Sequence, residues 1–580
     1  MTLLDPAEAE AAGPAGAPVA DPRPSDGGPL RRLWRRPLGW HAAALALILL
    51  ALLPLMSPGS AFTSDEGAYA TQAQALDDGS WAYEYRAAPL DPTGTNFPII
   101  KSAQTGRSFF TYVSHPAYPV LLAAGQRLAG RVLGLHILPL LGAMAAAVAA
   151  WLLAAEIDPG SSRAAFWLVA ASPAVANGYL LWAHSISAAL AGVALAAAVR
   201  IVRRGPTPLM VGGLAAALAA GALLRSEALL LALVVTAVVA ASRLRRGGIV
   251  AGVTIGAALA APTALAVLIE RRWTASIVGV GSRNLDLRGE TSSYLSDRIA
   301  GARHELFNGH YETTRAALPV LLILGLVVVL GFVALRRPRP ESNRVLGLVA
   351  VAAVGLVGVR MALYPTEAVT GLFAAWPMAL LGVVLLRRRD RQRSGVGLLL
   401  AVVAGFMAAV VLTQYPEGGG AEWGGRFFSP IVVALAVLAV TGFRHRLADL
   451  PPLDRRWAAG CLSVVAVATA VLGLVTVGQG RARHERFIAA VTRHPAEVTV
   501  TTVQALPRIA WRTDQELTWM VTGSGLAPLL DRLDGQGLDR MAVVTDHGAP
   551  SSTWPDGWKA TEVDEPSLRG AGLGLFLLER

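Results

Sequence analysis

The sequence has few charged residues and almost no cysteine. Only 16% of its 580 residues are charged, whereas soluble globular proteins carry about 25%. Its single cysteine, Cys461, lies in an apolar segment. It excludes an intramolecular disulfide, and we interpret it as an inert packing residue. The glycine loops that cradle nucleotide phosphates are also missing, so nothing in the sequence points to a bound nucleotide.

The residues that are abundant are apolar. Hydrophobic residues make up 54% of the chain, and the mean hydropathy is +0.49, which indicates a polytopic membrane protein. The net charge of +11 would also suit a nucleic-acid partner. The arginines, however, cluster in short loops between apolar segments, as cytoplasmic loops do. We therefore expect the lipid bilayer as the partner, and no nucleic acid.

Apolar segments predict about 13 transmembrane helices. They lie at about 39–56, 132–154, 164–179, 181–199, 208–223, 226–242, 248–268, 316–335, 345–363, 370–386, 395–413, 427–443 and 457–478. Arginine clusters fall in the N-terminal segment and then in alternate loops, near residues 163, 200–204, 243–246, 336–339, 387–393 and 444–456. All of these positions come out cytoplasmic, and the odd number of spans puts residues 480–580 outside.

Three domains follow from this layout. Residues 1–38 are predicted to be a disordered cytoplasmic tail, because they contain no apolar run. Residues 39–479 form the transmembrane domain, with a large external loop at 57–131 whose stretches 66–77 and 117–129 are predicted interface helices. Residues 480–580 combine β-rich runs at 498–503, 541–545 and 574–578 with a helical stretch at 525–535, which predicts a small α/β domain. The fold class is thus an all-α polytopic protein of the plasma (inner) membrane, with a small C-terminal α/β extracytoplasmic domain.

Two adjacent carboxylates, Asp65 and Glu66, follow the first apolar segment. Lipid phosphates repel an acidic pair at a membrane surface, so we consider the pair a catalytic candidate. The alternative is a helix N-cap, in which Ser64 or Asp65 caps a helix that starts near Gly67. The two interpretations are compatible, since a helix start also fixes the direction of a carboxylate.

Two further charged groups interrupt apolar segments at predicted external turns. Arg225 and Glu227 flank Ser226. The pair is a candidate substrate site, in which the Arg225 guanidinium binds a phosphate bidentately, or it is a mutual ion pair. Glu422 and Arg426 lie in a glycine-rich loop at 414–428. Glycine permits close backbone approach and arginine supplies positive charge, although a flexible loop with an interfacial tryptophan is the alternative.

Other side chains are either further candidate ligands or histidines that we interpret as structural. In the first loop, Lys101 and His115 are candidate phosphate ligands and Tyr69 a candidate substrate contact, although a lone histidine is more often structural. His304 and His310 lack the spacing of a metal motif, so we interpret their loop as surface. His184 lies in an apolar segment and is expected to be packed.

The arrangement resembles the GT-C superfamily of polytopic glycosyltransferases, and within it the branch of protein mannosyltransferases and the lipid A aminoarabinose transferase. Three features carry the resemblance: Asp65-Glu66 after the first span with Tyr69 following, His115-Pro116 at an interface helix, and Arg225-Ser-Glu227 at an external turn. Relatives have an Arg-Pro-Glu at that turn, and in some of them a lysine that contacts donor phosphate stands where His115 lies.

The resemblance implies transfer of a sugar, with inversion, from a polyprenyl-phosphate donor to a hydroxyl of a glycan, lipid or protein acceptor on the outer face. In these relatives the residue matching Asp65 is the catalytic base. Because neighbouring side chains on a helix diverge by about 100°, Glu66 is expected to orient the acceptor, support the loop or ligate a metal. No cofactor is certain from the sequence, and a divalent metal is left open.

Two alternatives to an enzyme are a transporter or flippase of lipid-linked sugars and a non-catalytic assembly subunit whose tail is a binding module. A transporter predicts polar residues or broken helices near the bilayer midplane. Here the ionisable residues gather at the outer ends of the apolar segments, which favours the enzyme.

Overall fold

The computed structural model describes residues 37–56, 59–98, 104–105, 108–110, 115–278, 294–309, 314–339, 341–413, 422–513, 516–522, 525–546, 554–569 and 572–580. The predicted disordered tail, apart from its last two residues, lies outside the described part. So do Lys101, His310 and residues 414–421 of the glycine-rich loop.

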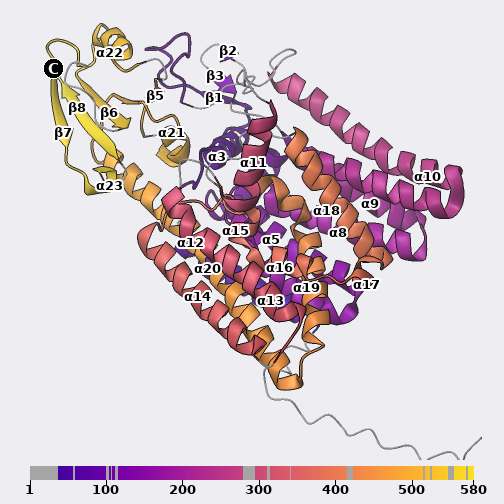
Figure 1. Ribbon diagram of the computed structural model, residues 1–580. Helices are drawn as coiled ribbons and strands as arrows, with labels where there is room; N and C mark the ends of the chain where they lie inside the picture. Colours follow the sequence, from indigo (N-terminus) through magenta and orange to yellow (C-terminus); the bar gives the residue numbers. More distant parts are fainter. Residues whose placement is uncertain are drawn as a thin grey trace, which may run out of the picture.

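Helices make up almost all of the membrane domain (Figure 1). Its first half contains α2 (Leu38–Leu52) with the 3-10 turn η1 (Leu53–Met56), α5 (Leu133–Ile157), η2 (Pro159–Ser161), α6 (Ser162–Ala170), α7 (Pro173–Asn177), α8 (His184–Arg204), α9 (Pro208–Leu224) and α10 (Ser226–Val278). Its second half contains α12 (Thr314–Gly325), the π-helical turn η3 (Leu326–Leu330), α13 (Gly331–Arg336), α14 (Ser342–Leu363), α15 (Leu372–Ala375), α16 (Pro377–Val384), α17 (Arg388–Arg391), α18 (Ser394–Thr413), η4 (Arg426–Ile431), α19 (Val432–Leu447) and α20 (Pro452–Thr492).

The apolar helices make this a multi-pass membrane protein. Within the described ranges, nine helical segments are long and apolar enough to cross a membrane, and α9 is apolar but shorter. One of the nine, α10, covers two predicted segments and turns at Gly248, whose φ of 78° is readily adopted by glycine. The number of spans, about 13, therefore remains a prediction.

Two predicted spans are broken in the structure. The segment 164–179 is divided into α6 and α7, and 370–386 into α15 and α16. Pro173 and Pro377 stand at the first positions of α7 and α16, where a proline is tolerated because its missing N–H has no partner in a helix anyway. A continuous apolar run in the sequence did not reveal these breaks.

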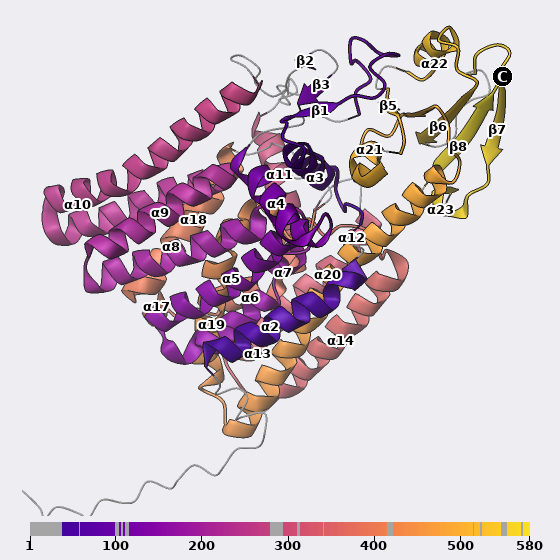
Figure 2. The ribbon, with the colours of Figure 1, turned by 180° about the vertical axis from the view of Figure 1, so that it is seen from behind.

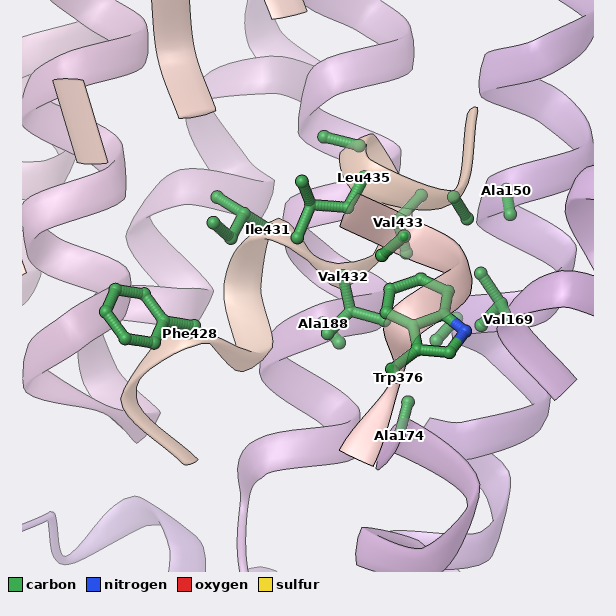
Figure 3. Packing of buried hydrophobic residues seen from close by; sticks show 14 of the residues in the cluster. Ala150, Val169, Ala174, Ala188, Trp376, Phe428, Ile431, Val432, Val433 and Leu435 are labelled. Carbon is green, nitrogen blue, oxygen red and sulfur yellow. The ribbon is translucent and has the colours of Figure 1, made fainter. Parts of the chain in front are cut away.

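The core of the bundle lies around α19, of which 94% of the apolar stretch is buried. Small residues allow its close packing: a Cβ on Gly442 would lie 2.0 Å from the carbonyl oxygen of Gly382 in α16, so the two backbones touch. Figure 3 shows the fully buried Trp376, at the break between α15 and α16, among apolar side chains of neighbouring helices. The break between α15 and α16 is thus filled by a packed side chain.

The loop after α2, which is predicted to be external and is called the external loop below, contributes α3 (Ser64–Asp77), β1 (Ala82–Glu84), β2 (Gln104–Thr105), β3 (Ser108–Phe110) and α4 (Ala117–Ala129). A later loop contributes α11 (Tyr294–Phe307). The helices lie where the sequence predicted them, at 66–77 and 117–129. The three strands, in the antiparallel order β1-β3-β2, were not predicted.

The C-terminal residues form a small mixed sheet with short helices, in line with the predicted α/β composition. It contains β4 (Val498–Thr501), α21 (Leu506–Ile509), η5 (Trp511–Thr513), β5 (Trp519–Val521), α22 (Ala527–Asp534), β6 (Arg540–Asp546), β7 (Lys559–Val563), α23 (Pro566–Arg569) and β8 (Leu573–Glu579). The strand order is β5-β4-β6-β8-β7, with β4 parallel to β5 and β6, and β8 antiparallel to β6 and β7.

Both faces of this sheet are covered. Along β6, Met541 and Val543 belong to an apolar cluster with α22, while Ala542 and Val544 belong to a cluster with α21, α23 and the end of α20. This division follows from the alternation of side chains along a strand. The first cluster also takes in Tyr85 and Phe97 of the external loop. Figures 1 and 2 accordingly show α3 and the sheet at the same end of the helical bundle.

Candidate active site

Asp65 is held by the start of α3. The residue lies in the first turn of the helix, where a carboxylate is favoured by the helix dipole. Its side chain is 49% exposed and accepts a hydrogen bond of 3.0 Å from Nη1 of Arg426. A carboxylate that is both fixed in direction and accessible can accept a proton from a bound substrate.

Arg426 is fixed by the end of the glycine-rich loop. Gly424 and Gly425 precede it with φ of 75° and 67°, values that other residues rarely adopt. The Arg426 backbone N–H donates to Oε1 of Glu422 over 3.0 Å, and its Nε lies 3.0 Å from Oε2 of the same carboxylate. Its guanidinium also lies 5.6 Å from the ring centroid of Trp182. The guanidinium is therefore shared between the buried Glu422 and the half-exposed Asp65.

Glu422 has a second carboxylic neighbour in Glu305 of α11. Glu422 is fully buried, and Glu305 hydrogen-bonds to it. Burial raises the pKa of Glu422, although the charge of Arg426 opposes the rise. Two carboxyl groups that share a hydrogen bond hold one proton between them, so this pair offers Arg426 less than two full negative charges. Glu305 was not among the residues predicted from the sequence.

Arg225 and Glu227 form the mutual ion pair that was the alternative interpretation of their turn. The guanidinium donates through Nε and Nη2 to the two carboxylate oxygens, over 2.9 and 2.6 Å. Glu227 is almost fully buried, and the electrostatic influence of Asp65 reaches Arg225. Arg225 is therefore close to the proposed base, but a phosphate would have to share the guanidinium with Glu227.

Aromatic and imidazole groups lie near Arg225. Tyr69 packs edge-to-face on Tyr118 of α4, with ring centroids 5.1 Å apart. Burial raises the pKa of Tyr118 well above its ordinary value, so its hydroxyl keeps its proton. Nδ1 of His115 lies 3.2 Å from Oε1 of Glu270. A carboxylate therefore lies where a phosphate bound to His115 was expected.

Glu66 points away from Asp65 and is fully buried. Its Oε1 accepts from the backbone N–H groups of Phe62 and Thr63 over 2.9 and 3.0 Å, as in a capping box. Its Oε2 accepts from the backbone of Leu181 over 3.0 Å and pairs with Arg481, which is also fully buried. Glu66 thus holds α3 to the bundle, which is the supporting role that the sequence left open.

The helix cap itself differs from the one proposed. The helix begins at Ser64, and Thr63 occupies the cap position. Asp65 lies within the first turn and does not cap the helix. The histidines differ in part as well. His184 is packed edge-to-face on Trp182, as expected. His304 was expected on the surface, but it is buried in α11 beside the hydroxyl of Thr370.

Arg508 of the C-terminal domain is a neighbour of Asp65 that sequence reasoning missed. Burial lowers the pKa of Arg508, and the charge of Asp65 opposes that effect. No sequence signal could have linked the two, because they are more than 400 positions apart. Within the described residues, no group of three or more histidine, cysteine, aspartate or glutamate side chains is arranged to hold a metal ion.

No family model matches the chain, and no curated protein matches it. Among solved structures the chain is similar to ArnT from Cupriavidus metallidurans in the apo state, with 12% identity over 93% of this chain and 97% of that chain and a TM-score of 0.49. It is also similar to the same protein bound to undecaprenyl phosphate, with 15% identity over 93% and 98% of the chains and a TM-score of 0.43. A third similar structure is the Archaeoglobus fulgidus oligosaccharyltransferase in complex with zinc and sulfate, with 12% identity over 87% and 67% of the chains and a TM-score of 0.44.

Proposed function

We propose that this protein is an inverting glycosyltransferase that moves a sugar from a polyprenyl-phosphate donor to an acceptor hydroxyl on the outer face of the membrane. The observation that carries the proposal is the half-exposed Asp65 carboxylate, in contact with the Arg426 guanidinium and close to that of Arg225, where the apolar helices meet the external elements. A carboxylate beside guanidinium groups suits a reaction in which a proton is taken up and a phosphate departs.

The residues divide the work in a single displacement. The acceptor oxygen forms a bond to the anomeric carbon while the bond from that carbon to the phosphate oxygen breaks, and the phosphate keeps the electron pair. Asp65 takes the hydroxyl proton, a contribution typically worth ~10²–10⁴ in rate. Arg426 and Arg225 stabilise the charge that develops on the leaving phosphate. Since attack comes from the face opposite the phosphate, the configuration inverts.

Arg426 connects the two halves of this mechanism. In the structure it pairs with Asp65 as well as with Glu422. A donor phosphate that draws the guanidinium to itself would release Asp65 to act as a base. Lys101 and residues 414–421 lie outside the described part of the chain, and Lys101 remains a proposed phosphate ligand on the basis of its position in the sequence.

The test is the transfer rate of Asp65→Asn at saturating donor, with a panel of polyprenyl-phosphate sugars and cell-envelope acceptors. Asp77→Asn is a matched control, because Asp77 lies on the same helix and pairs with Nε of Arg127 over 2.8 Å. We expect Asp65→Asn to bind donor but lose most turnover, and Asp77→Asn to keep it. Near wild-type turnover of Asp65→Asn would rule out Asp65 as the base.

A transporter or flippase of lipid-linked sugars is the second candidate, and the broken helices favour it. The α6–α7 and α15–α16 breaks are the kind of interruption that transporters use at their binding sites. In this protein Trp376 fills one break and is fully buried, whereas the ionisable groups lie at the external end. Translocation of a labelled polyprenyl-phosphate sugar in vesicles without an acceptor would favour the transporter over the enzyme.

A further inference from the structure

The backbone of the C-terminal domain touches the helix turn that carries Asp65. A Cβ atom on Gly67 would lie 1.6 Å from the carbonyl oxygen of Arg508 in α21. Gly67 is two residues beyond Asp65, so the absence of a side chain at this position lets the domain reach the first turn of α3. Figure 1 shows α21 beside α3.

The domain is held in this position by several independent contacts. Helix α20 runs without a break for 41 residues from the bundle to the sheet, a length of about 60 Å. Asn96 of the external loop donates through its side chain to the backbone oxygen of Val521 and accepts the backbone N–H of the same residue, both over 2.9 Å. His484 on α20 contacts the backbone oxygen of Ala61 over 2.8 Å. Arg508 is therefore part of a fixed wall of the site.

The guanidinium of Arg508 differs from those of Arg225 and Arg426 in its partners. Each of those two has a buried carboxylate within 3.0 Å. In the described part of the chain, no carboxylate lies within salt-bridge distance of Arg508, although Asp65 is within electrostatic reach. Its Nε donates to the backbone oxygen of Gln504 over 3.3 Å. Its charge at the site is thus the least compensated of the three.

We propose that the C-terminal domain forms a wall of the active site and that Arg508 binds an anionic oxygen group of a substrate. A partly buried guanidinium without a close carboxylate partner matches a phosphate or carboxylate through paired hydrogen bonds. The group is the donor phosphate or a charged substituent on the acceptor. Calling the ligand a substrate rests on the proposed glycosyltransferase function, whereas anion binding at Arg508 does not.

The experiment compares Arg508→Gln with a matched control, Arg486→Gln. Both arginines donate Nε to the backbone oxygen four residues earlier over 3.3 Å, but Arg486 is exposed on α20. The first arm measures binding of an unglycosylated polyprenyl phosphate to the full-length protein in detergent. The second arm measures KM for two acceptors that differ only in a charged group. Loss of a charged hydrogen-bond partner predicts a change of about 10- to 100-fold.

Weaker binding of polyprenyl phosphate to Arg508→Gln, with Arg486→Gln unchanged, identifies the donor phosphate as the ligand. A raised KM for the charged acceptor alone identifies the acceptor. Arg508→Gln that behaves like Arg486→Gln in both arms, or that raises KM equally for charged and neutral acceptors, overturns the proposal. Arg508→Lys, which keeps the charge without the fork, distinguishes loss of binding from loss of folding. If the wild type transfers no sugar, the binding arm still decides the proposal.

Discussion

Replacing Glu66 with glutamine should destabilise the protein more than replacing its neighbour Asp65 with asparagine. Glu66 and Arg481 are both fully buried and pair with each other. The glutamine would leave the Arg481 guanidinium without its counter-charge, although Nη1 still lies 3.2 Å from Nε2 of His136. Breaking a buried ion pair from one side typically costs about 3–5 kcal/mol. Asp65 is 49% exposed, and loss of an exposed pair typically costs about 0–1 kcal/mol.

The assay is heating of each variant in detergent, followed by measurement of the fraction that remains monodisperse. We expect Glu66→Gln to lose this fraction at a clearly lower temperature than Asp65→Asn. The double variant Glu66→Gln with Arg481→Met removes both charges, and it should recover part of the loss because no charge remains buried alone. Equal stability of Glu66→Gln and Asp65→Asn would refute the assignment of Glu66 to support. This comparison is also required before low turnover of Glu66→Gln is attributed to chemistry.

Three further predictions follow from other contacts, and a fourth follows from the arginine-rich loops. Arg426→Gln should weaken donor binding, since a charged hydrogen-bond partner is typically worth ~1.5–3 kcal/mol; unchanged affinity in a titration would remove Arg426 from the phosphate site. Arg225→Gln should destabilise the protein because Glu227 stays buried without its partner. Donor affinity is therefore measured on the double variant Arg225→Gln with Glu227→Gln. Gly67→Ala should displace α21 from α3, which should increase proteolysis and lower turnover. Gly460→Ala, with nothing within 4 Å of the added Cβ, should leave both proteolysis and turnover unchanged. A C-terminal reporter that works only in the cytoplasm should be inactive, since the arginine loops place residues 480–580 outside.

Local patterns in the sequence predicted α3 and α4 well, because the apolar and polar spacing of a helix is read within a few turns. The cap of α3 was placed at Ser64 or Asp65 instead of Thr63, and α11 was not predicted. The same reasoning located β4, β6 and β8, whose buried runs alternate between two covered faces. It did not locate β1, β2 and β3, whose two or three residues are too few for a pattern of period two. It also missed the breaks at Pro173 and Pro377, because each is surrounded by apolar residues on both sides.

The sequence predicted only those residues of the candidate site that are unusual in their local context. Asp65, Arg225 and Arg426 stood out because charge is costly beside apolar segments. The long-range pairings did not stand out, since Glu66 and Arg481 are 415 positions apart in the sequence and Asp65 and Arg426 are 361 apart. Arg481 lies just beyond the last predicted apolar segment, and nothing in the neighbouring sequence indicates that it is buried. Its complete burial depends on packing between α20 and the external loop, which no single segment encodes.

The division between Asp65 and Glu66 follows from the geometry of the helix on which both stand. Successive side chains of a helix point about 100° apart, so only one of two adjacent carboxylates can face the bundle. Glu66 lies at the third position after the cap, where its carboxylate can turn back to the backbone of Thr63 and reach Arg481. That attachment fixes the rotation of α3 about its own axis. Asp65 then points toward Arg426 and stays half-exposed, so the buried acid orients the accessible one.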